Sequence, residues 1–171
     1  MLRTERVYLR KLEQTDLGRC HTWINTSEIL DGIGLFGPRS LVEQEHWYQS
    51  IQMSRTNIVF AVCLVADDSH IGNASVFDID YRNRNAGLAV FIGDAINRNR
   101  GSGTDVVKLL ADYAFDYLNL HRVYVKTSSE VAAMMYKRIG FIQEGVMREH
   151  AFFDGAYVDK RLFGLLRDDR P

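Results

Sequence analysis

The sequence lacks the features that mark secreted, membrane-spanning and metal-binding proteins. It has two cysteines, Cys20 and Cys63, which lie in apolar surroundings without the spacing of a metal site. We therefore expect two small buried side chains, and nothing implies an oxidising compartment. No apolar run approaches the roughly 20 residues of a membrane span, and the N-terminus shows no basic-then-apolar signal pattern. These absences predict a cytoplasmic protein without a membrane partner.

An excess of charge is also missing. Twenty-one basic residues face 22 acidic ones, so the formal net charge is −1 and gives no sign of a general nucleic-acid surface. The histidines show no ligand spacing, so we predict no metal. Repeats, linkers and low-complexity tracts are absent. A chain of 171 residues with 46% hydrophobic content is long enough for one compact domain and too short for two, which predicts a single domain over residues 1–171.

Apolar alternation predicts a sheet with mostly antiparallel strands. The expected strands cover residues 5–12, 57–65, 70–80, 86–92, 122–127, 141–153 and 156–166. Asp154 and Gly155 form the best short hairpin signal in the chain, between the last two strands. The order strand, helix, strand from residue 86 to residue 127 predicts one parallel pair with a right-handed crossover. The fold class is therefore α/β, a mixed sheet flanked by helices.

Capping residues mark the expected helices. Thr15 and Asp16 can cap a helix that runs to about Asn25, and Ser40 with Glu43 forms a capping box. The inner face of the second helix should carry Trp47, Tyr48 and Ile51. Between these two helices, residues 26–39 form a glycine-broken apolar loop, which is either a packed connection or a substrate-side lid. A later helix should begin after Ser129 and end at Gly140.

The chain is organised around residues 92–120, where a strand leads through a glycine-rich turn into a long helix. The helix should bury two rows with four-residue spacing: Val106, Leu110, Ala114 and Leu118, and Val107, Ala111 and Phe115. At its start, unpaired backbone N–H groups and the helix dipole favour an anion. Gly101 and Gly103 let a ligand approach the backbone, while Arg98 and Arg100 add positive charge. The alternative is a tight connection with two solvated arginines.

This turn is not one of the common nucleotide-binding loops. Thr104 and Asp105 stand where a P-loop requires lysine and serine or threonine, and Val106 replaces the third glycine of a dinucleotide-binding fold. The spacing Arg98-x-x-Gly101-x-Gly103 instead resembles the signature of the GNAT superfamily of acyl-CoA N-acetyltransferases. Other segments resemble its later motifs and the opening of its ribosomal-protein and small-amine branch: residues 118–123, 135–141, 144–145, Arg148, 6–12 and 16–17.

The resemblance implies a GNAT-like sheet that is splayed where the crossover begins, with acetyl-CoA as the co-substrate. It implies that the CoA pyrophosphate lies on the amides of residues 98–103 and that pantetheine follows the strand ending near Ile92. The cofactor-binding residues that it implies are Ile92, Arg98, Asn99, Arg100, Gly101, Ser102, Gly103, Thr104 and Ser129. It implies that Tyr136 is the general acid toward the CoA sulfur. Spacing alone would make Tyr136 a core aromatic residue.

Two positions depart from the pattern of the family. Ser129 stands where many relatives carry asparagine, and Gly87 stands where many carry glutamate, so the general base cannot be carried over. Four residues on strands that could face the cleft remain candidates: Asp78, Asp80, Glu149 and His150. The alternative is that each is a solvated strand residue.

Three functions remain open. The first is acetyl transfer to a primary amine of a small molecule, such as an amino sugar, a polyamine or an antibiotic. The second is acetylation of a protein N-terminus, and the third is a CoA-binding module without catalysis. A homodimer through an edge of the terminal hairpin is possible in each case.

Overall fold

The computed structural model describes residues 2–26 and 37–170. Its first half contains β1 (Val7–Lys11), α1 (Leu17–Ile24), α3 (Leu41–Met53), β2 (Ile58–Leu64), β3 (His70–Asp80) and β4 (Asn85–Ile92). Its second half contains α4 (Ser102–Asp112), the π-helical segment η3 (Tyr113–Tyr117), β5 (Arg122–Thr127), α5 (Glu130–Ile139), β6 (Ile142–Phe153) and β7 (Ala156–Leu166). Short 3-10 turns cover Gln14–Asp16 (η1), Ala95–Asn97 (η2) and Arg167–Asp169 (η4).

The strands form one sheet in the order β1-β2-β3-β4-β5-β7-β6. All neighbouring strands are antiparallel except β4 and β5, which are parallel. This confirms the predicted mixed α/β sheet and its single crossover. The sheet positions the two ends of the crossover, β4 and β5, at its centre.

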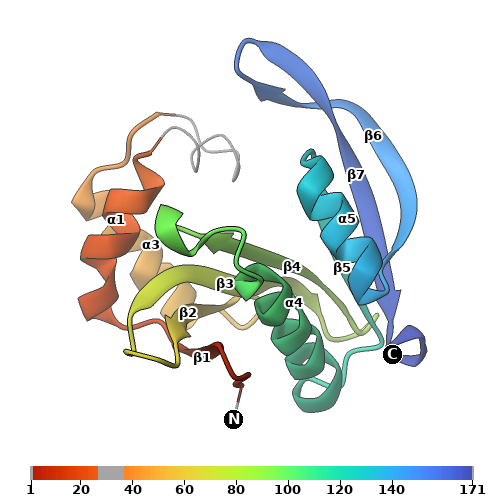
Figure 1. Ribbon diagram of the computed structural model, residues 1–171, viewed down its shortest axis with the longest axis horizontal. Coiled ribbons are helices and arrows are strands. Elements are labelled where there is room, and N and C mark those ends of the chain that lie inside the picture. Colours follow the sequence, from red (N-terminus) through yellow and green to blue (C-terminus); the bar gives the residue numbers. More distant parts are fainter. Residues whose placement is uncertain (1, 27–36, 171) are drawn as a thin grey trace.

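Helices cover the sheet on both faces (Figure 1). Strand β2 shows the division, because its side chains alternate between two cores. Phe60 and Val62 belong to the large core beneath α4 and α5, whereas Ala61 and Cys63 belong to a smaller one that Tyr48 of α3 also contacts. The α1 and α3 layer covers only the half of the sheet that precedes α4 (Figure 1). Among the described residues, no helix combines the length and the apolar content that crossing a membrane requires.

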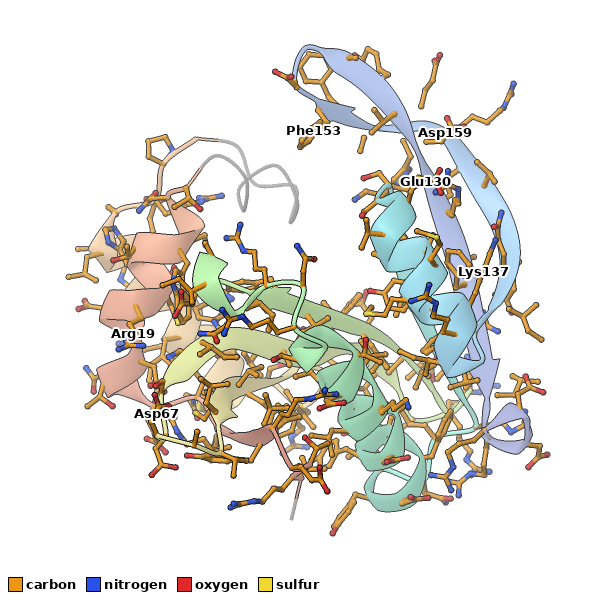
Figure 2. The ribbon with its side chains drawn as sticks, in the orientation of Figure 1. Arg19, Asp67, Glu130, Lys137, Phe153 and Asp159 are labelled. Carbon is orange, nitrogen blue, oxygen red and sulfur yellow. The ribbon has the colours of Figure 1, made fainter. Side chains whose placement is uncertain are left out.

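The predicted hairpin of β6 and β7 is confirmed. Asp154 and Gly155 have φ values of 47° and 79°, as the two central residues of a type I′ turn require. The hairpin extends well past α5, and Phe153 lies near its tip (Figures 1 and 2). Its two strands leave several large apolar side chains exposed: Ile142, Val146, Phe152 and Phe153 on β6, and Tyr157 on β7.

The predicted long helix is interrupted, which corrects the sequence analysis. It is α-helical only to Asp112, and η3 follows with a hydrogen bond from Leu118 N to Tyr113 O at 3.1 Å. A spacing of four residues per row exceeds the 3.6 residues of an α-helical turn, so the rows drift around the helix. The wider π turn absorbs this drift and keeps Ala114 and Phe115 buried.

The helix caps were predicted with mixed success. Ser40 with Glu43 forms the predicted capping box, and Ser129 caps α5. The cap predicted at Asp16 is wrong, because its carboxylate is bound by the Arg10 guanidinium at 2.7 Å and caps nothing in α1. On α3, Gln44 is the buried residue, and Trp47 remains 36% exposed. Most of the expected glycine-broken lid, residues 27–36, lies outside the described residues.

Candidate active site

The parallel pair β4 and β5 separates after a short seam. Its register contains three residue pairs: Asn85 with Arg122, Ala86 with Val123, and Gly87 with Tyr124. Beyond Gly87 the two strands part, so within residues 2–26 and 37–170 no strand pairs with residues 88–92 of β4 on that side. We call residues 88–92 the free edge. Its backbone groups need hydrogen-bond partners from elsewhere, and this is the splay that the family resemblance implied.

An aromatic side chain sets the sheet surface at the seam. The Phe77 ring crosses Gly87, where an added Cβ would lie 2.3 Å from Phe77 Cζ. Phe77 also makes an edge contact with Tyr124, with 6.1 Å between the ring centroids. The ring therefore leaves no room for a side chain at position 87, where the family resemblance led us to expect a carboxylate. Sequence reasoning identified the departure from the family pattern but not this packing.

The glycine turn, residues 98–103, lies between the free edge of β4 and the start of α4. Asn99 and Gly101 have positive φ values of 59° and 86°, and Gly101 is the N-cap of α4. No side chain of the described residues caps this helix. The first backbone bond runs from Asp105 N to Gly101 O at 3.1 Å. The amides of residues 102–104 precede that bond and therefore lack partners within the helix, as an anion site requires.

Arg98 is occupied at the end of β4. Its Nε donates to Ile92 O at 2.9 Å and its Nη2 to Gly93 O at 3.1 Å. Its amide donates to Ala95 O at 3.2 Å. In this conformation Arg98 fixes the turn to the strand, and Arg100 remains exposed beside it.

Sequence reasoning missed an ion pair behind the turn. Arg6 donates from Nε and Nη2 to the two carboxylate oxygens of Asp105, at 2.9 Å each. The Arg6 hydrogen bonds lower the pKa of Asp105, so that acid stays ionised in the first turn of α4. Arg6 also lies 3.2 Å from the position of a Cβ on Gly101. The ion pair links the turn to the residue that precedes β1. Because Arg6 and Asp105 are far apart in the sequence, no local pattern reveals the pair.

Tyr136 lies on the inner face of α5 and is 7% exposed. Its ring contacts Phe141 and Phe163, with centroid distances of 5.6 and 6.0 Å. Burial raises the pKa of Tyr136 to about 12. Within the described part of the chain, its hydroxyl makes no hydrogen bond. A protonated phenol in that state can donate to a ligand atom that enters beside it.

Ser129 is already engaged as the cap of α5. Its hydroxyl oxygen accepts from Ala132 N at 3.3 Å, and its amide donates to Thr127 Oγ1 at 3.0 Å. The hydroxyl proton remains available for a ligand. Figure 2 shows Glu130 at this end of α5, beside the hairpin with which its carboxylate forms an ion pair through Arg161.

A cavity of about 660 Å³ lies on the face of the sheet that α4 and α5 do not cover. It is enclosed between α1, α3 and strands β2 to β4. This volume is in the range of small-molecule sites. Residues 89–91 of the free edge form one wall. The lining combines apolar and aromatic groups with two carboxylates, and its main contributors are Trp47, Phe77, Phe91, Glu43 and Asp78.

The structure separates the four candidate bases. Asp78 lines the cavity. It has a φ of 51° in a register shift of β3, and its amide donates to Asn57 Oδ1 at 3.1 Å. Such bulges redirect side chains. Asp80 instead accepts from Asn83 in the next turn, and Glu149 and His150 are exposed on the hairpin. The described residues include no cluster of three or more acidic, histidine or cysteine side chains that could hold a metal.

Comparison with known proteins gives consistent matches. The family model for the acetyltransferase (GNAT) domain matches residues 6–142. The spermidine N(1)-acetyltransferase of Vibrio cholerae is 29% identical over 160 residues, which cover 92% of this chain and 91% of that protein. YdaF of Bacillus subtilis, whose name assigns it to ribosomal N-acetylation, is 30% identical over 106 residues, 61% of this chain and 57% of that protein.

The fold also resembles that of a solved acetyltransferase. A crystal structure of the Vibrio cholerae spermidine N-acetyltransferase, in complex with CoA and spermine, superposes with a TM-score of 0.91. The two sequences are 26% identical, and the match covers 97% of this chain and 98% of that one.

Proposed function

This chain belongs to the GNAT acetyltransferase family, and from that premise we propose that it acts as a single domain that transfers the acetyl group of acetyl-CoA to a primary amine of a small, positively charged molecule. One observation carries the proposal. Residues 89–91 belong both to the free edge of β4 and to the wall of the cavity. An acyl group held at that edge and an amine held in the cavity would therefore meet at the same strand.

The residues of the seam and the turn fit an acyl-CoA. Amides of residues 102–104 face no helical acceptor, so they suit pyrophosphate oxygens. The free edge offers backbone groups to the amides of a pantetheine arm. Bound there, acetyl-CoA supplies an activated acyl group. Gly103 leaves the approach open, because among the described residues a Cβ at this position would contact only Met135 Sδ, at 3.9 Å.

The cavity fits a cationic amine with an apolar body. Asp78 and Glu43 can attract an ammonium group, although Arg39 already contacts Glu43 at 3.0 Å. The aromatic faces of Trp47 and Phe77 suit both alkyl chains and cations. Relatives named as spermidine acetyltransferases make a polyamine one candidate, beside amino sugars and amine-bearing antibiotics.

The chemistry requires proton movement at two points. The amine must lose a proton before it attacks, and Asp78 is the carboxylate that we assign to receive it, directly or through water. Tyr136 donates its phenolic proton to the departing sulfur. A backbone N–H of the free edge donates to the acyl oxygen as negative charge develops on it.

Thiol release from acetyl-CoA tests this function on a panel of spermidine, an amino sugar, an aminoglycoside and a peptide with a free N-terminus. We expect saturable turnover on a small cationic amine. Asp78→Asn should lower kcat by about 10²- to 10⁴-fold, the usual contribution of a general base, and raise the KM for that amine about tenfold without changing the KM for acetyl-CoA. Asp80→Asn is the matched control, because Asp80 lies outside the cavity lining, and it should leave both values unchanged. CoA binding without turnover on any amine would contradict the proposal and identify an inactive CoA-binding module.

The second candidate is acetylation of a protein N-terminus, which the similarity to YdaF favours. Faster turnover on the peptide than on every small amine would select it. We further propose a cytoplasmic enzyme that functions without a metal, with no nucleic-acid or membrane partner. A homodimer stays part of the proposal, because the hairpin of β6 and β7 leaves large apolar side chains exposed.

A further inference from the structure

A buried row of polar side chains leads from β1 to the wall of the cavity. Asp16 accepts from Arg10 at 2.7 Å, and its Oδ1 lies 3.4 Å from His70 Nδ1. His70 Nε2 lies 2.9 Å from Asn73 Oδ1, and Asn73 Nδ2 donates to Cys20 Sγ at 3.2 Å. Asp16, His70 and Asn73 are each 6% exposed. Asn73 and Cys20 line the cavity, yet the proposed transfer gives neither a role.

A backbone carbonyl fixes the protonation of the ring. His70 Nε2 also lies 2.9 Å from Gly72 O, and a peptide carbonyl can only accept a hydrogen bond. Nε2 therefore carries a proton whatever the charge of the ring. Among the described residues, buried Nδ1 makes no hydrogen bond, and Asp16 Oδ1 lies 3.4 Å from it. Burial lowers the pKa of His70 and so favours the neutral ring, and the carbonyl of Gly72 then places the single proton on Nε2.

The histidine in turn fixes the carboxamide of Asn73. A protonated Nε2 cannot accept a hydrogen bond, so an Nδ2 group facing it would bring two donors together; Asn73 therefore turns Oδ1 toward the ring and Nδ2 away from it. One N–H bond of Nδ2 points at Cys20 Sγ, a weak acceptor. The other has no acceptor within the part of the chain that the structure describes. The cavity wall at Asn73 therefore presents a hydrogen-bond donor of fixed polarity.

We propose that Asn73 determines specificity by binding an oxygen atom, a hydroxyl or a carbonyl, of the amine substrate, and that His70 is its positioning residue. This inference rests on the proposed function, in which the cavity holds the amine. Asn73 pairs with Phe91, two residues from the Ser75–Ala89 pair, so its oxygen site lies on the order of 7 Å along the strand from Ala89. A fully protonated polyamine offers this donor nothing to bind. An amine that also carries an oxygen satisfies it.

Cadaverine and the amino alcohol of the same chain length provide the test, because they differ only in a terminal ammonium or hydroxyl. We expect wild-type kcat/KM to favour the amino alcohol. Asn73→Asp replaces the donor by an acceptor of nearly the same shape, so the ratio of the two kcat/KM values should shift about tenfold toward cadaverine. His70→Phe keeps a ring beside Trp23 but frees the carboxamide to turn, and it should shift the ratio in the same direction. His121→Phe, at an exposed histidine, is the control.

A second measurement is independent of catalysis. Nitrogen-15 spectra of the wild-type protein, with the His70 signal identified by its loss in His70→Phe, should show the Nε2–H tautomer. An Nδ1–H tautomer would overturn the proposal, and so would turnover with an unchanged ratio in Asn73→Asp. Absence of turnover on every amine would instead overturn the proposed function, and the role of Asn73 with it.

Discussion

Replacing Tyr136 by phenylalanine should lower catalysis without lowering stability. The change removes one hydroxyl from a side chain that is 7% exposed and leaves its contacts with Phe141 and Phe163 in place. If that hydroxyl donates the proton to the departing sulfur, its loss should lower kcat by about 10²- to 10⁴-fold, the usual contribution of general acid catalysis. CoA binding should change little, because the amides of the turn are untouched.

The stability of the variant should not fall. The hydroxyl makes no hydrogen bond within the described residues, and its oxygen is not among the fully buried polar atoms, so no large desolvation penalty is relieved by removing it. The free energy of unfolding should therefore change by less than about 1 kcal/mol, which for a chain of this size is a shift in Tm of at most about 2–4 °C. A tyrosine that mainly supports the core through its hydroxyl would give a lower Tm.

The stability difference should also depend on pH. Burial raises the pKa of Tyr136 from 10.0 to about 12, so the folded chain keeps a proton that the unfolded chain loses. The protonated phenol of Tyr136 makes its full contribution to the free energy of unfolding below pH 10.0. About 3 kcal/mol of that contribution is lost as the pH rises to about 12. Tyr136→Phe lacks this loss, so the Tm difference between the two proteins should widen above pH 10.0.

Single-turnover thiol release, CoA titration and thermal melting measure the three quantities. Tyr113→Phe is the control. Tyr113 is a half-buried tyrosine of η3 that packs on Phe60 of β2, and it lies outside the seam. It should leave turnover unchanged. Wild-type turnover in Tyr136→Phe would refute the assignment of the acid. Reduced turnover together with a lower Tm would refute the reasoning about the unpartnered hydroxyl.

Three further changes test other parts of the site. Gly103→Val should weaken CoA binding at least tenfold by crowding the amides while Tm stays near wild type, and unchanged affinity in a titration would exclude the turn as the phosphate site. Asp105→Asn should lower Tm near neutral pH, because the Arg6 pair is lost. That difference should shrink as the pH falls through the lowered pKa of Asp105 and the wild-type carboxylate becomes protonated, which melting at acidic pH measures. Gly87→Ala should destabilise the chain by about 1–3 kcal/mol through its clash with the Phe77 ring, and Phe77→Leu should restore most of the loss; an unaltered Tm in the single variant would contradict the close packing.

The fold could be predicted to the extent that local patterns determine it. The alternation of apolar and polar residues, together with the turn residues, predicted the observed bounds of β3, β5 and β7, because side chains two residues apart share one face of a strand. Asp154 with Gly155, and Ser40 with Glu43, act within four residues. The η3 turn was missed because its row spacing also fits the pattern of an α-helix when only residue types are counted.

The candidate site was less accessible to sequence reasoning. The glycine turn is contiguous and was predicted, whereas the residues that line the cavity come from five elements, α1, α3, β2, β3 and β4, and are spread from Cys20 to Phe91. Asp78 could not be separated from Asp80, because only the register shift of β3 decides which carboxylate reaches the cavity. The tautomer of His70 depends on a carbonyl position that no sequence pattern reveals.

The brevity of the seam has a mechanical consequence for the chain. Three residue pairs join β4 to β5, and α4 and α5 pack on one face of the sheet at this join. A molecule bound along residues 88–92 would contact both halves of the sheet and hold them together. Binding of acetyl-CoA should therefore make local opening of the chain less frequent, and proteases should cut the ligand-free form first.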